Sequence, residues 1–488
     1  MSELADKAQA ALVNGTEDAV EAELAAWLAA NGPDLQLLQW RALLLRALDR
    51  RAEAIPLLET AARQAPNDPA IAHSLAQTSL EAGLNAAGLF EAALRLNPSS
   101  AEIRQGYVAA NQAVGNGRAM LDMLASGFET NPGWFDGHRQ YAQLATQLGL
   151  GERALETLDQ TAQRFPDEPN ASFVAIDLLS AATNYTAALE RAEAMLARFG
   201  DIPAVLLAKA VALGELGDGA AAKVLYAKLG PPADPKHAIY LMRQHLRDDD
   251  PKAALKVAEP WLATEFATQL WPYVGLAWRV LQNRQADWLE GQAGLVRTVD
   301  LDLPTEQLSA LAARLRTVHA GSGRFMDQSV RGGTQTDGPL FARIEPEIVQ
   351  IRQAMVAAFG THLAGLPPVD EHHPQLALPR NQAPRFAGSW SVRLVDEGFH
   401  ASHHHPLGWF SAVFYVAVPD DLTQTDGQLA LGGAPPELGL GLDPVQLIAP
   451  KPGRLAIFPS TMWHGTVPFS KGERMTIAFD LARPFAET

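Results

Sequence analysis

The sequence predicts a two-part molecule, an all-α solenoid of paired helices followed by an all-β jelly roll. Two observations predict it. Turn-type residues recur at intervals of 32 to 35 residues up to about residue 300, and short alternating apolar and polar runs follow Phe386. A chain of 488 residues is also too long for one hydrophobic core. We expect a helical solenoid over residues 1–300, a helical linker over 301–320 and a β domain over 321–488.

The composition excludes several kinds of protein. The chain has no cysteine, so disulfides, thiolate zinc sites and iron–sulfur clusters are excluded, and any metal must be held by histidines and carboxylates. A net charge of -16 argues against a nucleic-acid partner. No apolar run is long enough to span a membrane, and Met1-Ser2-Glu3 begins no signal peptide. We therefore expect a cytoplasmic protein, whose oligomeric state the sequence leaves open.

The first 300 residues contain a repeat. Its turn-type residues are Gly15, Asp49, Gly83, Gly115, Gly149, Asn184, Gly217, Asp249 and Asn283. In one unit, Ala70–Ala82 and Ala86–Leu96 are the expected helices, joined by a turn at Gly83 and ended by Pro98. A pair of helices with this period resembles the tetratricopeptide repeat, here in about nine units. The resemblance implies a concave face that binds a protein or peptide. The alternative is a solenoid that binds no such partner and either scaffolds the C-terminal domain or mediates self-association.

The residue pattern changes after the solenoid. Helices are expected over Pro304–His319 and Glu345–Leu363, with a polar, glycine-rich passage that includes Gly321-Ser322-Gly323 between them. Short strands with Gly and Pro between them predict a jelly-roll barrel, that is, a cupin-like double-stranded β-helix. The expected strands are Phe386–Leu394, Phe410–Val418, Gln428–Leu431, Val445–Ala449, Arg454–Phe458 and Arg474–Leu481.

Three histidines and one arginine in this domain form a candidate metal site. If His403-His404-His405 is extended, His403 and His405 share one side and His404 points away. With His464 from a distant strand they would grip a metal on one face and leave positions open, as iron(II) oxygenases need. Arg474 and Thr476 share one face of a later strand, where a buried guanidinium suits the carboxylate of a co-substrate.

These residues carry a family resemblance. His403-x-His405-Pro406, the strand Phe410–Val416, Phe458-Pro459-Ser460, His464 and Arg474 resemble the core of the iron(II)/2-oxoglutarate oxygenases, in a bacterial and phage subgroup related to prolyl hydroxylases. Residues 331–336, preceded by Asp327-Gln328-Ser329, resemble a segment of its repeat-linked members.

The resemblance implies a role for each matching residue. His403, His405 and His464 would bind Fe(II). Arg474, with Tyr415 as a helper, would bind the far carboxylate of 2-oxoglutarate, and Trp390 and Ser391 would line the pocket beside Thr476.

One departure keeps the ligand set open. Most of this superfamily has His-x-Asp or His-x-Glu where the chain has His403-x-His405. Three histidines can bind iron(II), but they also suit zinc, copper or nickel. Alternatively Asp396 or Glu397 supplies an oxygen ligand in place of His405, or the site binds no metal.

Two functions follow from these alternatives. The first is a dioxygenase that couples O₂ and the decarboxylation of 2-oxoglutarate to succinate with hydroxylation of a C–H bond, on a protein or peptide held by the repeats. The second is a non-catalytic scaffold or adaptor with a degenerate cupin-like barrel.

Overall fold

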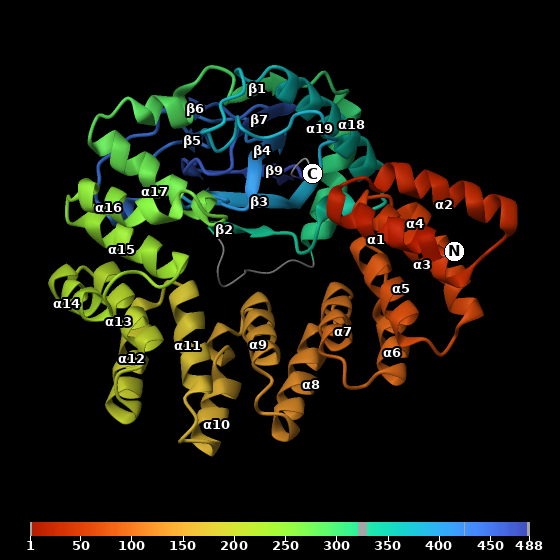
Figure 1. The fold of residues 1–488 in the computed structure, drawn as a ribbon, viewed down its shortest axis with the longest axis horizontal. Coiled ribbons are helices and arrows are strands. Elements are labelled where there is room, and N and C mark those ends of the chain that lie inside the picture. Colours follow the sequence, from red (N-terminus) through yellow and green to blue (C-terminus); the bar gives the residue numbers. More distant parts are fainter. Residues whose placement is uncertain (1, 321–328, 424, 486–488) are drawn as a thin grey trace.

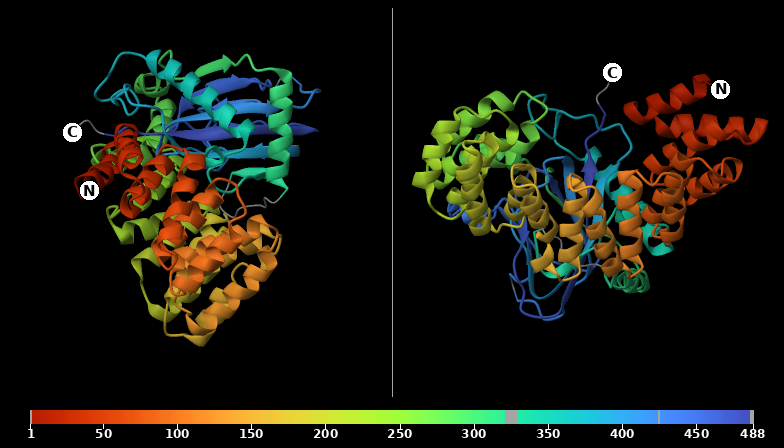
Figure 2. Two further views of the ribbon diagram at one scale, coloured as in Figure 1. Left: turned by 90° about the vertical axis from the view of Figure 1, so that its right-hand side faces the viewer. Right: turned by 90° about the horizontal axis from the view of Figure 1, so that it is seen from below.

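A computed structural model of the chain describes residues 2–320, 329–423 and 425–485. Gly321-Ser322-Gly323 and Asp327-Gln328 lie outside the described residues. The chain forms a helical solenoid that arcs around a C-terminal β domain (Figures 1 and 2), so the predicted fold class is confirmed. No helix within the described ranges is long and apolar enough to cross a membrane.

The solenoid consists of antiparallel helix pairs. Its helices are α1 (Ser2–Asn14), α2 (Glu17–Asn31), α3 (Leu35–Ala47), α4 (Arg51–Gln64), α5 (Pro69–Glu81), α6 (Ala87–Leu96), α7 (Ala101–Ala113), α8 (Gly117–Thr130), α9 (Phe135–Gln147), α10 (Glu156–Arg164), α11 (Asn170–Ala181), α12 (Tyr185–Phe199), α13 (Pro203–Glu215), α14 (Gly219–Leu229), α15 (Pro235–Arg247), α16 (Pro251–Ala258) and α17 (Ala267–Val280).

The repeating turn residues reverse the chain inside each pair. Seven of the nine predicted positions have a positive φ, and at the other two the residue just before, Thr183 or Gln282, takes that conformation. Such a residue closes the C-terminus of a helix at little cost when it is glycine. Polar caps start several of the first helices, because Asp34 accepts a hydrogen bond from Leu37 N and Ser100 from Ile103 N. The predicted period thus has a local cause at both ends of the helices.

The ninth unit differs from the others. After α17 the chain makes a π-helical turn at Asp287–Gly291 and enters strand β1 (Arg297–Asp300) instead of forming a second α-helix. Strand β1 pairs with β7 of the large sheet, so the sheet takes a strand from upstream of residue 301. The described solenoid therefore has eight pairs of α-helices and a single last helix.

Two antiparallel sheets form the β domain. The large sheet has the order β1-β7-β4-β9-β3-β2 and the small sheet β6-β5-β8. Beyond β1, the strands are β2 (Val330–Gln335), β3 (Phe386–His400), β4 (Gly408–Ala417), β5 (Leu429–Leu431), β6 (Gln446–Ile448), β7 (Arg454–Pro459), β8 (His464–Thr466) and β9 (Glu473–Ala482). All six expected strands are present. Strands β1, β2 and β8 were not predicted, because their residues do not alternate between apolar and polar side chains.

Helices α18 (Thr305–His319) and α19 (Pro346–Ala364) cover one face of the large sheet. Leu315, Ile351 and Phe359 of these helices pack against Phe414 and Ile477 of the strands in the largest apolar core. The other face of the sheet looks toward the small sheet. Side chains alternate along a strand, so one face of β4 and β9 fills this core and the other faces the space between the sheets.

Both ends of the solenoid contact the β domain. Near the N-terminus, the Arg385 guanidinium pairs with Glu17 of α2, and Ile344 N donates to Ala82 O after α5. At the other end, Trp463 Nε1 donates to Pro272 O of α17, and Arg279 donates to Gly432 O. The helices between α5 and α15 span the distance between these anchors (Figure 1).

Candidate metal centre and co-substrate pocket

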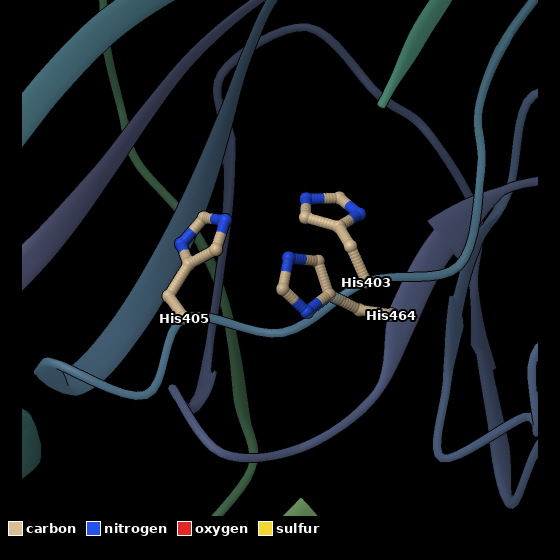
Figure 3. Close-up of side chains that lie close together, drawn as sticks. All are labelled: His403, His405 and His464. Atoms are coloured by element: carbon tan, nitrogen blue, oxygen red, sulfur yellow. The ribbon is translucent and has the colours of Figure 1, made fainter. Parts of the chain in front are cut away.

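Three histidines come together between the two sheets. His403 and His405 lie in the loop between β3 and β4, and His464 is the first residue of β8. One ring nitrogen from each lies within 4.8 Å of the others, and the three rings point toward a common space (Figure 3). The described residues contain no other such group of histidines and carboxylates.

The histidine run is a loop, although it keeps the alternation expected of a strand. His403 exchanges backbone hydrogen bonds with His464, at 2.9 and 2.8 Å, and His405 N donates to Ser460 O at 2.8 Å. These bonds hold the segment extended, so His404 turns away from the other two rings. Its ring packs edge-on against Tyr273 of α17 and against Trp463.

Hydrogen bonds leave one ring nitrogen of each histidine free. Nδ1 of His403 lies 2.8 Å from Ala401 O, and Nδ1 of His464 lies 2.9 Å from Met462 O. A carbonyl only accepts, so both Nδ1 atoms carry the proton and both Nε2 atoms keep a lone pair. Nδ1 of His405 lies 2.8 Å from a carboxylate oxygen of Asp480, which also only accepts, so this Nδ1 carries a proton too. Among the described residues, only Ser329 Oγ, at 3.4 Å, approaches Nε2 of His403.

Burial keeps two of these imidazoles neutral. It lowers the pKa of His403 to about 3, with a further contribution from His405, and it lowers the pKa of His464 well below its usual value. A metal binds only the neutral ring, so protons do not compete at neutral pH. The donor set therefore fits a divalent transition metal.

Arg474 lies in the same space without a carboxylate partner. Its side chain is 1% exposed, and Nε donates to Gly427 O at 3.1 Å. No ion pair joins it to a carboxylate in the part of the chain that the structure describes. A buried guanidinium without an anion is costly, so this position suits an anionic ligand.

Tyr415 and Thr476 accompany the arginine. The Arg474 guanidinium lies 4.9 Å from the centre of the Tyr415 ring, and the buried Tyr415 hydroxyl has no hydrogen-bond partner among the described residues. Burial raises the pKa of Tyr415, so its hydroxyl keeps the proton and can donate a hydrogen bond to an anion. Thr476 is 2% exposed and lines the cavity with Arg474, as their shared face predicted.

The two pocket residues predicted on β3 lie on opposite faces of the sheet. Trp390 lines the cavity, but Ser391 does not. Neighbouring side chains of a strand point to opposite faces, and Ser391 Oγ contacts His319 Nε2 of α18 at 2.9 Å on the outer face. The prediction that Ser391 lines the pocket is therefore wrong.

An acid in place of His405 has no support in the geometry. Asp396 and Glu397 are exposed, and Asp396 accepts a hydrogen bond from Gly472 N. Neither belongs to the group that could hold a metal.

Sequence reasoning missed Asp480 and Ser411. They are register partners on β9 and β4, and both line the cavity. The signal was available, because Asp480 continues the alternate positions of Arg474, Thr476 and Ala478.

One family model matches part of the β domain. Residues 388–480 match the model of a family described as "Putative 2OG-Fe(II) oxygenase". This family's name implies Fe(II) and 2-oxoglutarate, which fit the three histidines and the buried arginine. No curated protein sequence matches the chain.

Solved structures similar to the chain are of two kinds. A prolyl-4-hydroxylase of Pseudomonas putida is 19% identical, covering 42% of this chain and 98% of its own, with a TM-score of 0.28. A prolyl hydroxylase of Trichoplax adhaerens is 13% identical over 42% and 93%, with a TM-score of 0.29. Yeast Tom70 is 16% identical over 56% and 61%, with a TM-score of 0.35. At these scores the likenesses assign no function.

Proposed function

We propose that this chain is an Fe(II)- and 2-oxoglutarate-dependent dioxygenase that hydroxylates a C–H bond of a protein or peptide. The observation that carries the proposal is the convergence of three imidazoles beside a buried arginine that has no carboxylate partner among the described residues. Bound Fe(II) would supply the redox chemistry that couples O₂ to decarboxylation of 2-oxoglutarate.

The histidines would hold the metal through Nε2. The hydrogen-bond partners at Nδ1 fix the rings of His403, His405 and His464 in place. A metal held by three histidines would keep positions free for a co-substrate and O₂.

Arg474 orients the co-substrate. Its guanidinium can bind the far carboxylate of 2-oxoglutarate with charge-assisted hydrogen bonds, and the Tyr415 and Thr476 hydroxyls are placed to add to them. Trp390, Val413 and Phe458 line the rest of the cavity with apolar surface, which excludes water from the reacting atoms.

A hollow on the solenoid supports a peptide substrate. It measures about 550 Å³ and is lined from alternate helices by Arg46, His73, Ser74, Gln77, Leu80, Glu102, Gln105, Gly106, Ala109 and Gln140. Four of these residues, Ser74, Gln77, Gln105 and Gln140, carry a hydroxyl or an amide, and these groups can donate to and accept from the main chain of an extended peptide. The substrate-binding part of the proposal rests on this surface.

Succinate formation tests the proposed chemistry. Wild-type protein with Fe(II), 2-oxoglutarate and O₂ should form succinate, and His464→Ala should form none. Arg474→Leu should raise the KM for 2-oxoglutarate by about 10- to 100-fold, since it removes charge-assisted hydrogen bonds of ~1.5–3 kcal/mol. The matched control is Arg393→Leu, which removes an arginine paired with Glu473 on the neighbouring strand. Undiminished succinate formation in His464→Ala contradicts the proposal.

Trapping tests the substrate class. A His403→Ala variant should retain a protein or peptide that the wild type releases, and mass spectrometry should find one added oxygen on that molecule after exposure to wild type. Gln77→Ala and Gln105→Ala, added to His403→Ala, should reduce the amount of protein or peptide that is retained. If that amount is unchanged, the hollow on the solenoid does not bind the substrate.

A further inference from the structure

Among the described residues, Asp480 is the one charged group hydrogen-bonded to the three candidate ligand histidines. Its Oδ1 lies 2.8 Å from Nδ1 of His405 and 2.6 Å from Oγ of Ser411. The carboxylate is largely buried, with 13% of its side chain exposed. The corresponding nitrogens of His403 and His464 meet only backbone carbonyls. One of the three rings is thus held by a negative charge and two by neutral groups.

The surroundings fix Asp480 in this position. It pairs with Ser411 across β9 and β4, and Ser411 Oγ also contacts Ser460 Oγ at 3.0 Å. The turn after His405 ends at Gly408, which lies close to Ser460 and Asp480. A Cβ at Gly408 would lie 2.4 Å from Ser460 Oγ and 3.3 Å from Asp480 Cβ. These contacts make the carboxylate part of the wall that orients His405.

Charge explains why a carboxylate belongs here. The common facial site for iron(II) combines two histidines with one carboxylate, which offsets part of the metal's charge. Three imidazoles offer no negative charge, so the metal would carry its full double charge in a partly buried site. A carboxylate bonded to the outer nitrogen of a ligand histidine makes that ring a better donor and can change metal affinity by about 10- to 100-fold.

We propose that Asp480 is a positioning residue that supplies, through His405, the negative charge that the three histidines lack. His405 and Asp480 together then do what a single carboxylate ligand does in the common site. This inference rests on the proposed function, because it requires a metal at the three histidines. It predicts that the charge of Asp480, and not only its hydrogen bond, sets the affinity for the metal.

Cobalt binding separates the charge from the hydrogen bond. Co(II) serves as an air-stable probe, titrated into the purified full-length chain and followed by its visible absorption and by competition with a chelating dye. Asp480→Asn keeps an oxygen that can accept from His405, and it should weaken Co(II) binding by about tenfold. Asp480→Ala removes the acceptor as well and should weaken it further. Asp421→Asn, in an exposed turn of the same domain, removes an equal charge and should leave the affinity unchanged.

A second background distinguishes positioning from simple structural support. In the His405→Asp variant the ligand itself carries a negative charge, so the charge that Asp480 supplies through His405 is no longer needed. In that background Asp480→Asn should change Co(II) binding by much less than the weakening of about tenfold expected in the wild type. If Asp480 only supports the fold, Asp480→Asn weakens binding equally in both backgrounds.

The outcomes divide the two proposals. If the wild type binds Co(II) and Asp480→Asn binds it with the same affinity, the role of Asp480 is overturned and the proposed function stays intact. An equal weakening in both backgrounds also overturns it. A wild-type chain that binds neither Co(II) nor Fe(II) overturns the proposed function, and the role of Asp480 with it.

Discussion

At the scale of single residues, the direction of each ring nitrogen decides what the histidines can do. The chain contains buried histidines with the same burial and opposite surroundings. His373 is fully buried, and its two nitrogens meet the carbonyls of Trp288 and Leu289 and the backbone N–H of Gln375. His362 is 1% exposed, and neither of its nitrogens has a partner among the described residues.

This contrast predicts stability changes of opposite sign. His362 lies edge-on to Phe410 at 4.8 Å in an apolar core, so His362→Leu should raise the free energy of unfolding by about 1–2 kcal/mol by removing an unsatisfied polar group. His373→Leu should lower it by about 1–3 kcal/mol, because it leaves buried backbone groups unpaired. Denaturant unfolding at neutral pH measures both. Loss of stability in His362→Leu would show that the ring has a partner in solution.

Alternation along the chain made most of the site residues predictable. His403, His405, Arg474 and Thr476 follow from spacing by two, and all of them face the space between the sheets. The same rule separates Trp390 from Ser391, but only once the register of β3 is known. The packing partners of His373 and His404 could not be predicted, because Trp288 and Tyr273 lie far away in the sequence.

At the scale of elements, the last solenoid helix supports the histidine loop. Tyr273 of α17 packs edge-on against His404 at 5.6 Å and against Trp463 at 5.5 Å. His404 lies between two of the candidate ligands, and Trp463 directly precedes the third. Helix α17 therefore holds the outer side of the segments whose inner side carries the three histidines.

We expect removal of this support to weaken metal binding. Tyr273→Leu keeps an apolar side chain but loses the edge-on ring contacts, so the histidine loop should loosen and the Co(II) dissociation constant should rise by about tenfold. Tyr107→Leu makes the same change in α7, in the middle of the solenoid, and should not alter it. Equal affinities in wild type and Tyr273→Leu would mean that the loop holds its shape without α17.

A second histidine connects three elements on the opposite face of the sheet. His319 of α18 contacts Thr334 of β2 through Nδ1 and Ser391 of β3 through Nε2, both at 2.9 Å. Burial, with a smaller effect of Arg393, lowers its pKa to about 4. The unfolded chain, with a histidine pKa of ~6.5, therefore binds more protons than the folded chain between these two values.

This difference predicts acid sensitivity. The contribution of His319 to stability is complete above pH ~6.5 and is lost as the pH falls toward 4, by about 3 kcal/mol in all. In His319→Gln the free energy of unfolding should therefore fall by about 3 kcal/mol less over this pH range than in the wild type. His372→Gln, in an exposed loop, should leave the slope unchanged. An unaltered slope in His319→Gln would contradict the assignment.

The elements differ in how well their sequence predicts them. The helix pairs are predictable because a positive-φ turn residue and a local period repeat in every unit. The strands β1 and β8 are not, since their pairing partners are distant and their residues carry little pattern of their own. The end of the solenoid is equally hidden, because the chain leaves it through a π-helical turn.

At the scale of the whole molecule, the solenoid is attached to the β domain at both ends. The attachment near the N-terminus centres on Glu17, whose side chain is 1% exposed and pairs with Arg385. Breaking a buried pair leaves the other charge without compensation. The ion pair therefore contributes to holding α1 and α2 against the β domain.

Loss of that charge should release the first helices. Glu17→Gln should lower the free energy of unfolding by about 2 kcal/mol and speed limited proteolysis within α1 and α2. Glu23→Gln, on the same helix and half exposed, should change stability by less than about 0.5 kcal/mol. Proteolysis at the wild-type rate in Glu17→Gln would show that other contacts hold this end.

The proposed function requires that three histidines hold one iron beside a pocket for 2-oxoglutarate. The most direct test is the visible absorption of the full-length chain on anaerobic addition of Fe(II) and then 2-oxoglutarate. We expect a weak band that needs both additions, saturates at one iron per chain, and disappears in each of His403→Ala, His405→Ala and His464→Ala. Absence of the band in the wild type, or its survival in His405→Ala, would contradict the claim.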